Sequence, residues 1–375
     1  MDKIKGNILK KTIGVLTGGG DCSGLNAAIR AVVKTAINDY GMDVIGFKDG
    51  YLGLVESQFK KFTLNDASGL LTIGGTILGT SNKADPFNYV VYTKKNKFTK
   101  KDMSKIALKN YKRLKLSALI CIGGDGTLFI ANKLSKIGLN IVGIPKTIDN
   151  DLCATDVTIG FNSAVAIATD AIDKLHSTAM SHHRVMIIEV MGRYAGWLAL
   201  ESGIAGGGDI ILIPEIPYDI KIVCQKVLER HHKGKRFSII VVAEGAKPIG
   251  GNMSINKIVK DSPDPIRLGG IGTLLGNEIE KRTGLETRAT ILGHLQRGGI
   301  PTAYDRVLAT RLGREAVHLA EKKLFGIMVA LKGKDIVAVK LEEAVGKLCK
   351  VECNSSLIAA AKSLGVSFGI KKGDI

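Results

Sequence analysis

The sequence predicts an α/β protein made of two Rossmann-like lobes, each built on a doubly wound, mainly parallel sheet. Short segments rich in Ile and Val alternate with longer segments of helical periodicity almost throughout the chain. Such alternation is typical of parallel strands joined by helical crossovers. At 375 residues, with 45% hydrophobic residues, the chain exceeds one usual core and has enough apolar material for two.

The predicted strands are short and bounded by turn residues, as buried strands are. We expect them at residues 12–17, 43–48, 117–122, 139–144, 184–190, 209–213, 237–243 and 287–293. The segments between them show helical spacing of apolar residues. We expect helices at residues 24–40, 101–114, 126–136, 162–180, 195–205, 218–232 and 303–322. No low-complexity linker or repeated period separates the lobes, so we infer a boundary near Gly160.

The formal net charge of +18 favours acidic or phosphorylated ligands. Nucleic acid is the rival partner, but aromatic residues make up only 5% of the chain and no dense Lys/Arg tract is interleaved with them. We therefore expect no nucleic-acid partner.

The chain has no run of 18 apolar residues, and its first residues lack the order of a signal peptide. The six cysteines are scattered and lack the paired spacing of a zinc site. We therefore expect no membrane partner, reduced cysteines and a cytoplasmic location.

Residues 143–151 pack a lysine, a threonine and two aspartates behind a short apolar strand. A polar run at the carboxyl end of such a strand is where α/β proteins place ligands. Lys146, Thr147, Asp149 and Asp151 are the side chains that this loop offers. The alternative is a turn rich in Asp and Asn with local hydrogen bonds.

Two glycine-rich stretches also join a predicted strand to a predicted helix. Residues 16–26 contain Gly18, Gly19 and Gly20, and residues 121–127 contain a Gly-Gly-Asp-Gly-Thr segment. Glycines let a phosphate approach the backbone, and a helix N-terminus favours the anion. The first stretch lacks the Gly-Lys-Ser/Thr of a Walker A loop, and a tight turn explains it equally well.

Further charged residues flank the predicted strands of the second half. Arg184 and Arg193 lie at opposite ends of one strand, so they would serve different sites or different subunits, unless each simply makes a surface ion pair. Glu244 follows another strand, where a plain surface turn is the alternative. His294 and Arg297 follow a third, and the arginine suits phosphate binding.

Taken together and in this order, these segments resemble the ATP/pyrophosphate-dependent phosphofructokinase family, from Thr12 to about Leu331. The match rests on Gly-Gly-Asp-Gly-Thr at 123–127, Thr-Ile-Asp-Asn-Asp at 147–151, Met-Gly-Arg at 191–193 and Gly-His-Leu-Gln-Arg-Gly-Gly at 293–299. The resemblance implies phosphorylation of fructose 6-phosphate to fructose 1,6-bisphosphate, the committing step of glycolysis. It also implies that the chain crosses back between lobes of residues 1–160 plus about 298–341, for the donor, and 161–297 plus about 342–375, for the sugar phosphate.

The resemblance assigns roles residue by residue. Asp149 would be the general base, Thr147 and Arg193 would stabilise transferred charge, and Asp125 with Asp151 would hold Mg²⁺. The positions that match the family's donor site are Gly19, Asn82, Lys83, Gly124, Asp125, Gly126 and Thr127. Those that match its substrate site are Thr147, Ile148, Asp149, Arg184, Met191, Gly192, Arg193, Glu244, Arg288, His294 and Arg297.

In the family, the residues matching Arg184 and Arg288 reach into a neighbouring subunit's site, so the resemblance implies a homodimer or homotetramer with shared active sites. Lys146 and Asn82 depart from the familiar allosteric bacterial enzymes and resemble the mixed-substrate branch. Pyrophosphate users of that branch usually carry an aspartate where this chain has Gly126. We expect ATP as donor because glycine leaves room for its α-phosphate. Lys146 keeps a pyrophosphate-dependent phosphotransferase as the alternative, and a non-catalytic sugar-phosphate-binding regulator is the alternative of another class.

Overall fold

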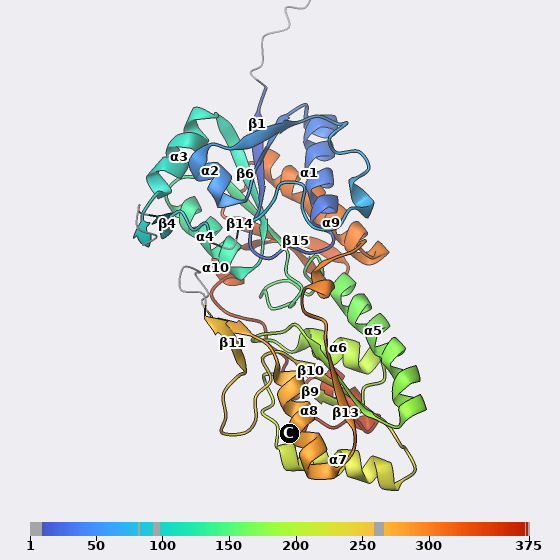
Figure 1. The fold of residues 1–375 in the computed structure, drawn as a ribbon. Coiled ribbons are helices and arrows are strands. Elements are labelled where there is room, and N and C mark those ends of the chain that lie inside the picture. The colour runs from blue at the N-terminus through green and yellow to red at the C-terminus, as the bar shows by residue number, and fades with distance from the viewer. Residues whose placement is uncertain (1–9, 82, 93–97, 259–265, 372, 374–375) are drawn as a thin grey trace, which may run out of the picture. The chain divides into compact units, whose positions relative to one another are not determined.

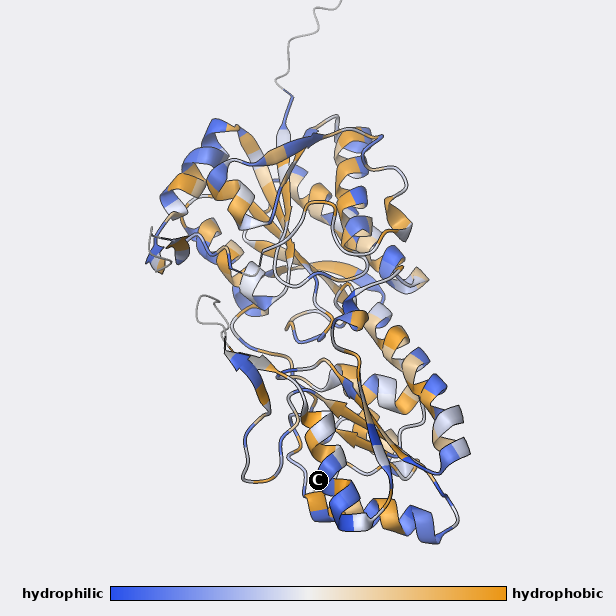
Figure 2. Cartoon of the chain, in the orientation of Figure 1, coloured by the Kyte–Doolittle hydropathy of each residue, from blue (hydrophilic) through white to orange (hydrophobic). Residues whose placement is uncertain are grey.

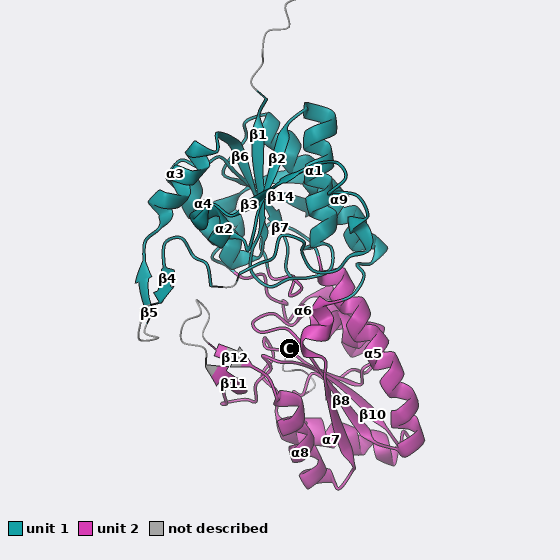
Figure 3. Cartoon of the chain, turned by 45° about the horizontal axis from the view of Figure 1, so that its top comes forward, with its two compact units in different colours: residues 1–147, 152–159, 299–347 teal, residues 148–151, 160–298, 348–375 magenta. Residues whose placement is uncertain are grey.

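The chain folds into two compact units, each described here by itself (Figure 3). Unit 1 comprises residues 1–147, 152–159 and 299–347, and unit 2 comprises residues 148–151, 160–298 and 348–375. The computed structural model describes residues 10–81, 83–92, 98–258, 266–371 and 373. The chain passes from unit 1 to unit 2 between Ile159 and Gly160, and it does so for the last time after Lys347. Because unit 1 takes residues 342–347, the C-terminal contribution to unit 2 begins at Leu348.

Unit 1 is built on a seven-stranded sheet in the order β15-β14-β7-β6-β1-β2-β3 (Figure 1). Its strands are β1 (Thr12–Thr17), β2 (Asp43–Phe47), β3 (Phe59–Phe62), β6 (Leu116–Gly123), β7 (Ile141–Pro145), β14 (Ile327–Lys332) and β15 (Asp335–Lys340). The central strands pair in parallel, whereas β3 and β15 pair antiparallel to their neighbours. The mainly parallel sheet that the sequence predicted is confirmed. β3 was missed because its Phe-Lys-Lys-Phe sequence has no apolar run.

Helices cover both faces of this sheet. Helices α1 (Leu25–Tyr40) and α9 (Ala303–Glu321) pack against each other on one face. On the other face, α2 (Tyr51–Glu56), α3 (Ser104–Arg113) and α4 (Asp125–Lys136) share a core with residues of the strands such as Leu16, Leu119 and Cys121. The short elements of this unit are η1 (Leu70–Thr72), α10 (Leu341–Ala344) and the hairpin β4 (Tyr89–Tyr92) and β5 (Phe98–Lys101). In Figure 2 the inner strands are largely orange, whereas the helices carry both orange and blue.

Unit 2 contains a four-stranded parallel sheet in the order β13-β8-β10-β9. Its strands are β8 (Val185–Val190), β9 (Ile210–Leu212), β10 (Ser238–Ala243) and β13 (Thr287–Ile291). Its helices are α5 (Phe161–His182), α6 (Trp197–Ala205), α7 (Ile220–His232), α8 (Ile271–Thr283) and α11 (Ser356–Ser363). Helices α7 and α8 build a core against one face of the sheet, whereas α5 contacts β8 and β10, and α6 contacts β9 and β10. The predicted strand at 287–293 ran too far, because Gly293 has φ +47° and begins the 3₁₀ helix η2 (Gly293–Arg297).

Helices α8 and α11 of unit 2 were not predicted, and neither were two further features. One is the hairpin of β11 (Ile255–Ile258) and β12 (Ile266–Leu268). The other is the path of the C-terminal tail, residues 348–375, in which Ser367 pairs in parallel with Ile210 beside the edge strand β9. Among the described residues, every helix is too short or too polar to cross a bilayer.

Candidate active site

In unit 1, the loops that follow β1, β6 and β7 are joined by hydrogen bonds at the edge of the sheet that is formed by the carboxyl ends of its strands. The backbone N–H of Gly18 donates to the carbonyl of Ile122 at 3.0 Å, and that of Lys146 donates to Gly123 at 3.0 Å. The three strands are neighbours and parallel, so their carboxyl ends meet. The two glycine-rich stretches and the start of the 143–151 loop therefore form one cluster, at the place where α/β sheets commonly bind ligands.

Thr127 explains why two of these positions are glycine. It lies in the first turn of α4, is only 6% exposed, and its carbonyl accepts from the hydroxyl of Tyr51 at 2.7 Å. A Cβ atom built at Gly18 would lie 2.7 Å from Oγ1 of Thr127, and one at Gly123 would lie 2.4 Å from its Cβ. Separations under 3 Å force a neighbour to move, so the loops and the helix start fit only because both residues lack a side chain.

Lys146 and Gly126 give this cluster its charge and its open space. The side chain of Lys146 is 3% exposed, and its ammonium group donates to the carbonyl of Gly20. Its Nζ lies 3.6 Å from the place of a Cβ at Gly19, so the cation stands beside the first glycine-rich loop. A Cβ at Gly126 would have no atom within 4 Å. By resemblance, Gly126 is the position where pyrophosphate users usually carry an aspartate. The space around this position is therefore open.

Asp125 begins α4, where a carboxylate is stabilised by the helix dipole. Its Oδ1 accepts from the backbone N–H of Gly346 at 2.9 Å. Asp125 belongs to unit 1 and Asp151 to unit 2. In the part of the chain that the structure describes, no three His, Cys, Asp or Glu side chains gather as a metal site. The donor chemistry nevertheless suits Mg²⁺, which proteins commonly hold through one or two carboxylates together with substrate phosphates.

The remaining predicted donor residues lie on or after the segment 74–81. Thr80 ties this segment to the first glycine-rich loop, because its hydroxyl donates to the carbonyl of Gly19 at 2.6 Å. Lys83 follows and is exposed. Asn82 lies outside the described residues, so its predicted role is not addressed by the structure.

In unit 2, the carboxyl ends of β8, β10 and β13 line a cavity of about 210 Å³. Met191, Glu244 and His294, which the sequence predicted for the substrate site, all contribute to it. Each follows a different strand of the parallel sheet, and the three strands are adjacent. The sheet thus brings together residues that lie about 50 positions apart in the sequence, as expected at this edge of an α/β sheet.

The turn that carries Arg193 is held by close backbone contacts. Gly192 has φ +133°, and its carbonyl accepts from the N–H of Gly245 at 3.1 Å. A Cβ at Gly245 would lie 1.9 Å from the carbonyl oxygen of Arg193. The guanidinium of Arg193 donates to the carbonyl of Ile266 and lies 5.2 Å from the ring centroid of Tyr194. The arginine is therefore fixed at both its backbone and its side chain.

Glu244 is the most strongly perturbed carboxyl group at this edge. Burial raises its pKa to about 7, and the negative charges of Asp149 and Glu189 act in the same direction. Arg193 and Arg297 oppose the shift. Three residues predicted for the substrate site, Asp149, Arg193 and Arg297, therefore act electrostatically on a fourth, Glu244.

Glu189 and Gln296 are functional candidates that the sequence reasoning missed. Glu189 is 3% exposed, and its carboxylate accepts from the N–H groups of Gly270 at 3.0 Å and Gly272 at 2.8 Å, at the start of α8. Gln296 is 1% exposed, and its side-chain oxygen accepts from the N–H of Met191 at 3.2 Å. A glutamate within an otherwise apolar strand is the signal that was available for Glu189.

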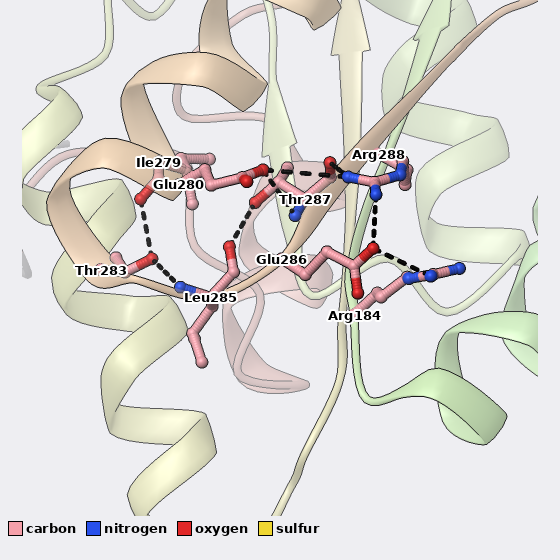
Figure 4. A network of polar contacts seen from close by, with 8 residues as sticks. All are labelled: Arg184, Ile279, Glu280, Thr283, Leu285, Glu286, Thr287 and Arg288. Atoms are coloured by element: carbon pink, nitrogen blue, oxygen red, sulfur yellow. Dashed lines mark hydrogen bonds and ion pairs between the residues drawn. The ribbon is translucent and has the colours of Figure 1, made fainter.

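Arg184 and Arg288 do not join this cavity. Both lie near the amino ends of their strands, and both pair with one carboxylate, Glu286 (Figure 4). Arg184 contacts it at 2.9 Å, and Glu280 lies 4.0 Å from Arg288. The pairing of Arg288 with Met186 in the sheet places it at the opposite edge from Met191. Arg184 and Arg193 are therefore at opposite ends of one strand, as the sequence predicted.

Comparisons with known proteins find similar sequences in one family. A model of the phosphofructokinase family matches residues 12–320. An ATP-dependent 6-phosphofructokinase 2 of Clostridium perfringens is 55% identical, covering 96% of this chain and 98% of that protein. A pyrophosphate–fructose 6-phosphate 1-phosphotransferase of Amycolatopsis mediterranei is 52% identical, covering 90% of this chain and 95% of that protein.

The fold is also found in solved structures. The phosphofructokinase of Saccharomyces cerevisiae superposes with a TM-score of 0.76 at 32% identity, over 95% of this chain and 47% of that one. This chain therefore spans about half the length of the yeast protein.

Proposed function

The chain belongs to the phosphofructokinase family, and from that premise we propose that it transfers the terminal phosphoryl group of ATP to the 1-hydroxyl of fructose 6-phosphate. The product is fructose 1,6-bisphosphate, and the reaction commits the sugar to glycolysis. The observation that carries the proposal is identity of 55% to an ATP-dependent 6-phosphofructokinase over nearly its whole length. We place the enzyme in the cytoplasm.

In this proposal the cluster of unit 1 binds the donor and the cavity of unit 2 binds the sugar phosphate. The donor lobe comprises residues 1–160 and about 298–341. In it, the donor is lined by Gly19, Asn82, Lys83, Gly124, Gly126 and Thr127. Backbone N–H groups of glycine-rich loops and a helix start suit phosphates. Residues 161–297 and about 342–375 hold fructose 6-phosphate. The closeness of Met191, Glu244 and His294 around one cavity supports this division.

Asp149 acts as the general base that accepts the proton of the attacking hydroxyl. Thr147 and Arg193 stabilise the charge of the transferred group, and the fixed turn of Arg193 supports such a role because preorganised charges need no rearrangement during the reaction. Asp125 and Asp151 would hold Mg²⁺, which would neutralise charge on the donor phosphates.

The active unit is a homodimer or homotetramer with shared active sites. Arg184 and Arg288 lie at the opposite edge of the sheet from Glu244 and His294. Within one unit 2 they are therefore not available to the cavity that we assign to the sugar phosphate. A role in binding the same substrate requires that they act on a neighbouring subunit's site.

Pyrophosphate is the competing donor, because a relative of almost the same identity bears a pyrophosphate-dependent name. The buried ammonium of Lys146 beside the glycine-rich loop would neutralise a released phosphate. The open space at Gly126 leaves room for the α-phosphate of a nucleotide. We give the greater weight to Gly126, since an aspartate there would repel that phosphate.

The deciding experiment measures the initial rate of fructose 1,6-bisphosphate formation with magnesium and either saturating ATP or saturating pyrophosphate. We expect ATP to support the higher rate. A preference for pyrophosphate would show that pyrophosphate, and not ATP, is the donor, while fructose 6-phosphate would remain the acceptor. Saturable binding of fructose 6-phosphate without turnover by either donor would instead indicate a sugar-phosphate-binding regulator.

A further inference from the structure

The C-terminal tail of unit 2 begins with hydrogen bonds to the loop that carries Asp149. The backbone N–H of Cys349 donates to the carbonyl of Asp151 at 2.8 Å. The carbonyl of the same Cys349 accepts from the indole Nε1–H of Trp197 at 2.9 Å. Both backbone polar groups of Cys349 are thus used to join the Asp149 loop to the first residue of α6.

The same tail is tied to the turn that carries Arg193. Oε1 of Glu215 accepts from the backbone N–H of Gly196 at 2.9 Å and from that of Val351 at 2.9 Å. Gly196 ends the Arg193 turn and directly precedes Trp197. Residues 349–351 therefore connect two separate loops, and each loop holds a residue that we assign to the reaction.

Burial indicates that these ties are well defined. Val351 is 3% exposed. Oε2 of Glu215 is buried without a hydrogen-bond partner among the described residues, and Glu215 lines a cavity of about 80 Å³ together with Arg193, Lys247 and Lys350. A buried carboxylate oxygen without a hydrogen bond is unfavourable, and the nearby cationic side chains offset part of this cost by their attraction.

We propose that residues 349–351 are a positioning element of the active site, held in place by the side chains of Trp197 and Glu215. The element fixes the loop of Asp149 relative to the turn of Arg193 within unit 2. This inference rests on the proposed role of Asp149 as general base. A base must lie within hydrogen-bond reach of the proton that it takes, and a misplacement of about 1 Å lowers the rate by roughly 10²-fold.

The first test is Trp197→Phe in the full chain, which removes the indole N–H donor and keeps an aromatic ring at the start of α6. We expect kcat to fall by roughly tenfold to a hundredfold. The KM values for ATP and fructose 6-phosphate should change little, because no group that contacts a substrate is removed. An unchanged kcat would overturn the proposal.

A second test compares two changes at Glu215. Glu215→Gln keeps a side-chain oxygen that accepts from Gly196 and Val351, whereas Glu215→Ala removes it. The glutamine variant should therefore retain clearly more of the wild-type kcat than the alanine variant. Equal loss in both would mean that the two hydrogen bonds do not position the loops, and would overturn the role of Glu215.

The matched control is Ser355→Ala in the same tail. Its hydroxyl caps α11 by accepting from the N–H of Ile358 at 3.4 Å, and it takes no part in the ties described above. We expect a lower melting temperature with unchanged kcat. A loss of kcat in this control equal to that of Trp197→Phe would show a general effect of tail stability and overturn the proposal. Wild-type enzyme without turnover on either donor would overturn the proposed function itself, together with this inference.

Discussion

The strand ends of the two units are built from different chemistry. In unit 1 the loops after β1 and β6 are glycine-rich and fit closely against Thr127. In unit 2 the corresponding edge carries three ionisable side chains, Glu189, Glu244 and His294, among the apolar and glycine residues that line its cavity. The comparison teaches that the glycine-rich edge of unit 1 depends on close backbone approach, whereas the edge of unit 2 adds ionisable groups to its own close glycine contacts. Substitutions should therefore act through volume in unit 1 and through charge and pH in unit 2.

The largest effect should come from the charged edge. Asp149→Asn removes the proposed base and keeps the size of the side chain, so kcat should fall by roughly 10²–10⁴-fold with little change in KM for fructose 6-phosphate. Steady-state kinetics with ATP measures both constants. Wild-type turnover in this variant would remove Asp149 from the reaction.

The glycine-rich edge should respond to a single methyl group. Gly123→Ala places a Cβ 2.4 Å from the Cβ of Thr127, and we expect the free energy of unfolding to fall by about 1–3 kcal/mol, as for other overpacked sites. Gly126→Ala is the matched control, because its Cβ meets no atom within 4 Å. Urea denaturation would compare the two variants, and equal stability would contradict the steric account of this edge.

The pH dependence of stability should report on Glu244. Its pKa is raised to about 7 in the folded chain, mainly by burial, whereas an unfolded glutamate titrates near 4.3. Between these two values the folded state binds more protons than the unfolded state, so this group lowers stability as pH rises from about 4.3 to about 7. Glu244→Gln should abolish this contribution, roughly 4 kcal/mol. Melting temperatures of both proteins from pH 4.5 to 8 would test it, and parallel pH profiles would contradict the assignment.

The smallest effect on stability is expected at the amino edge of unit 2. Glu286 is 41% exposed and pairs with Arg184 and Arg288 (Figure 4). Glu286→Gln should change the free energy of unfolding by less than about 1 kcal/mol, because exposed ion pairs contribute little. Thermal denaturation measures this change. A loss of several kcal/mol would show that the network is structural.

Much of the fold was predictable from the sequence because its signals are local. Apolar segments such as Ile13 to Leu16 and Ile239 to Val242 are bounded by turn residues, and all eight predicted strands are present with ends shifted by at most a few residues. The edge strands β3 and β15 and the hairpins β4–β5 and β11–β12 were missed, since polar or short segments are recruited by their neighbours and carry little pattern of their own. The apolar, buried strand β14 and helix α8 were also missed, although each has a pattern of its own.

The sequence by itself determined the α/β class and the positions of the glycine-rich turns after the strands, because strand periodicity and turn residues act over a few residues. It also determined the family, through the order and spacing of the motifs. Only the tertiary structure decided that Glu189 accepts hydrogen bonds from the start of α8 and that Glu286 pairs with both Arg184 and Arg288. It also decided that the backbone N–H of Cys349 donates to the carbonyl of Asp151. Except for the pairing within 286–288, these contacts join residues about 80 or more positions apart. They form only when the sheet brings its strand ends together, and no local pattern specifies which distant partners will meet.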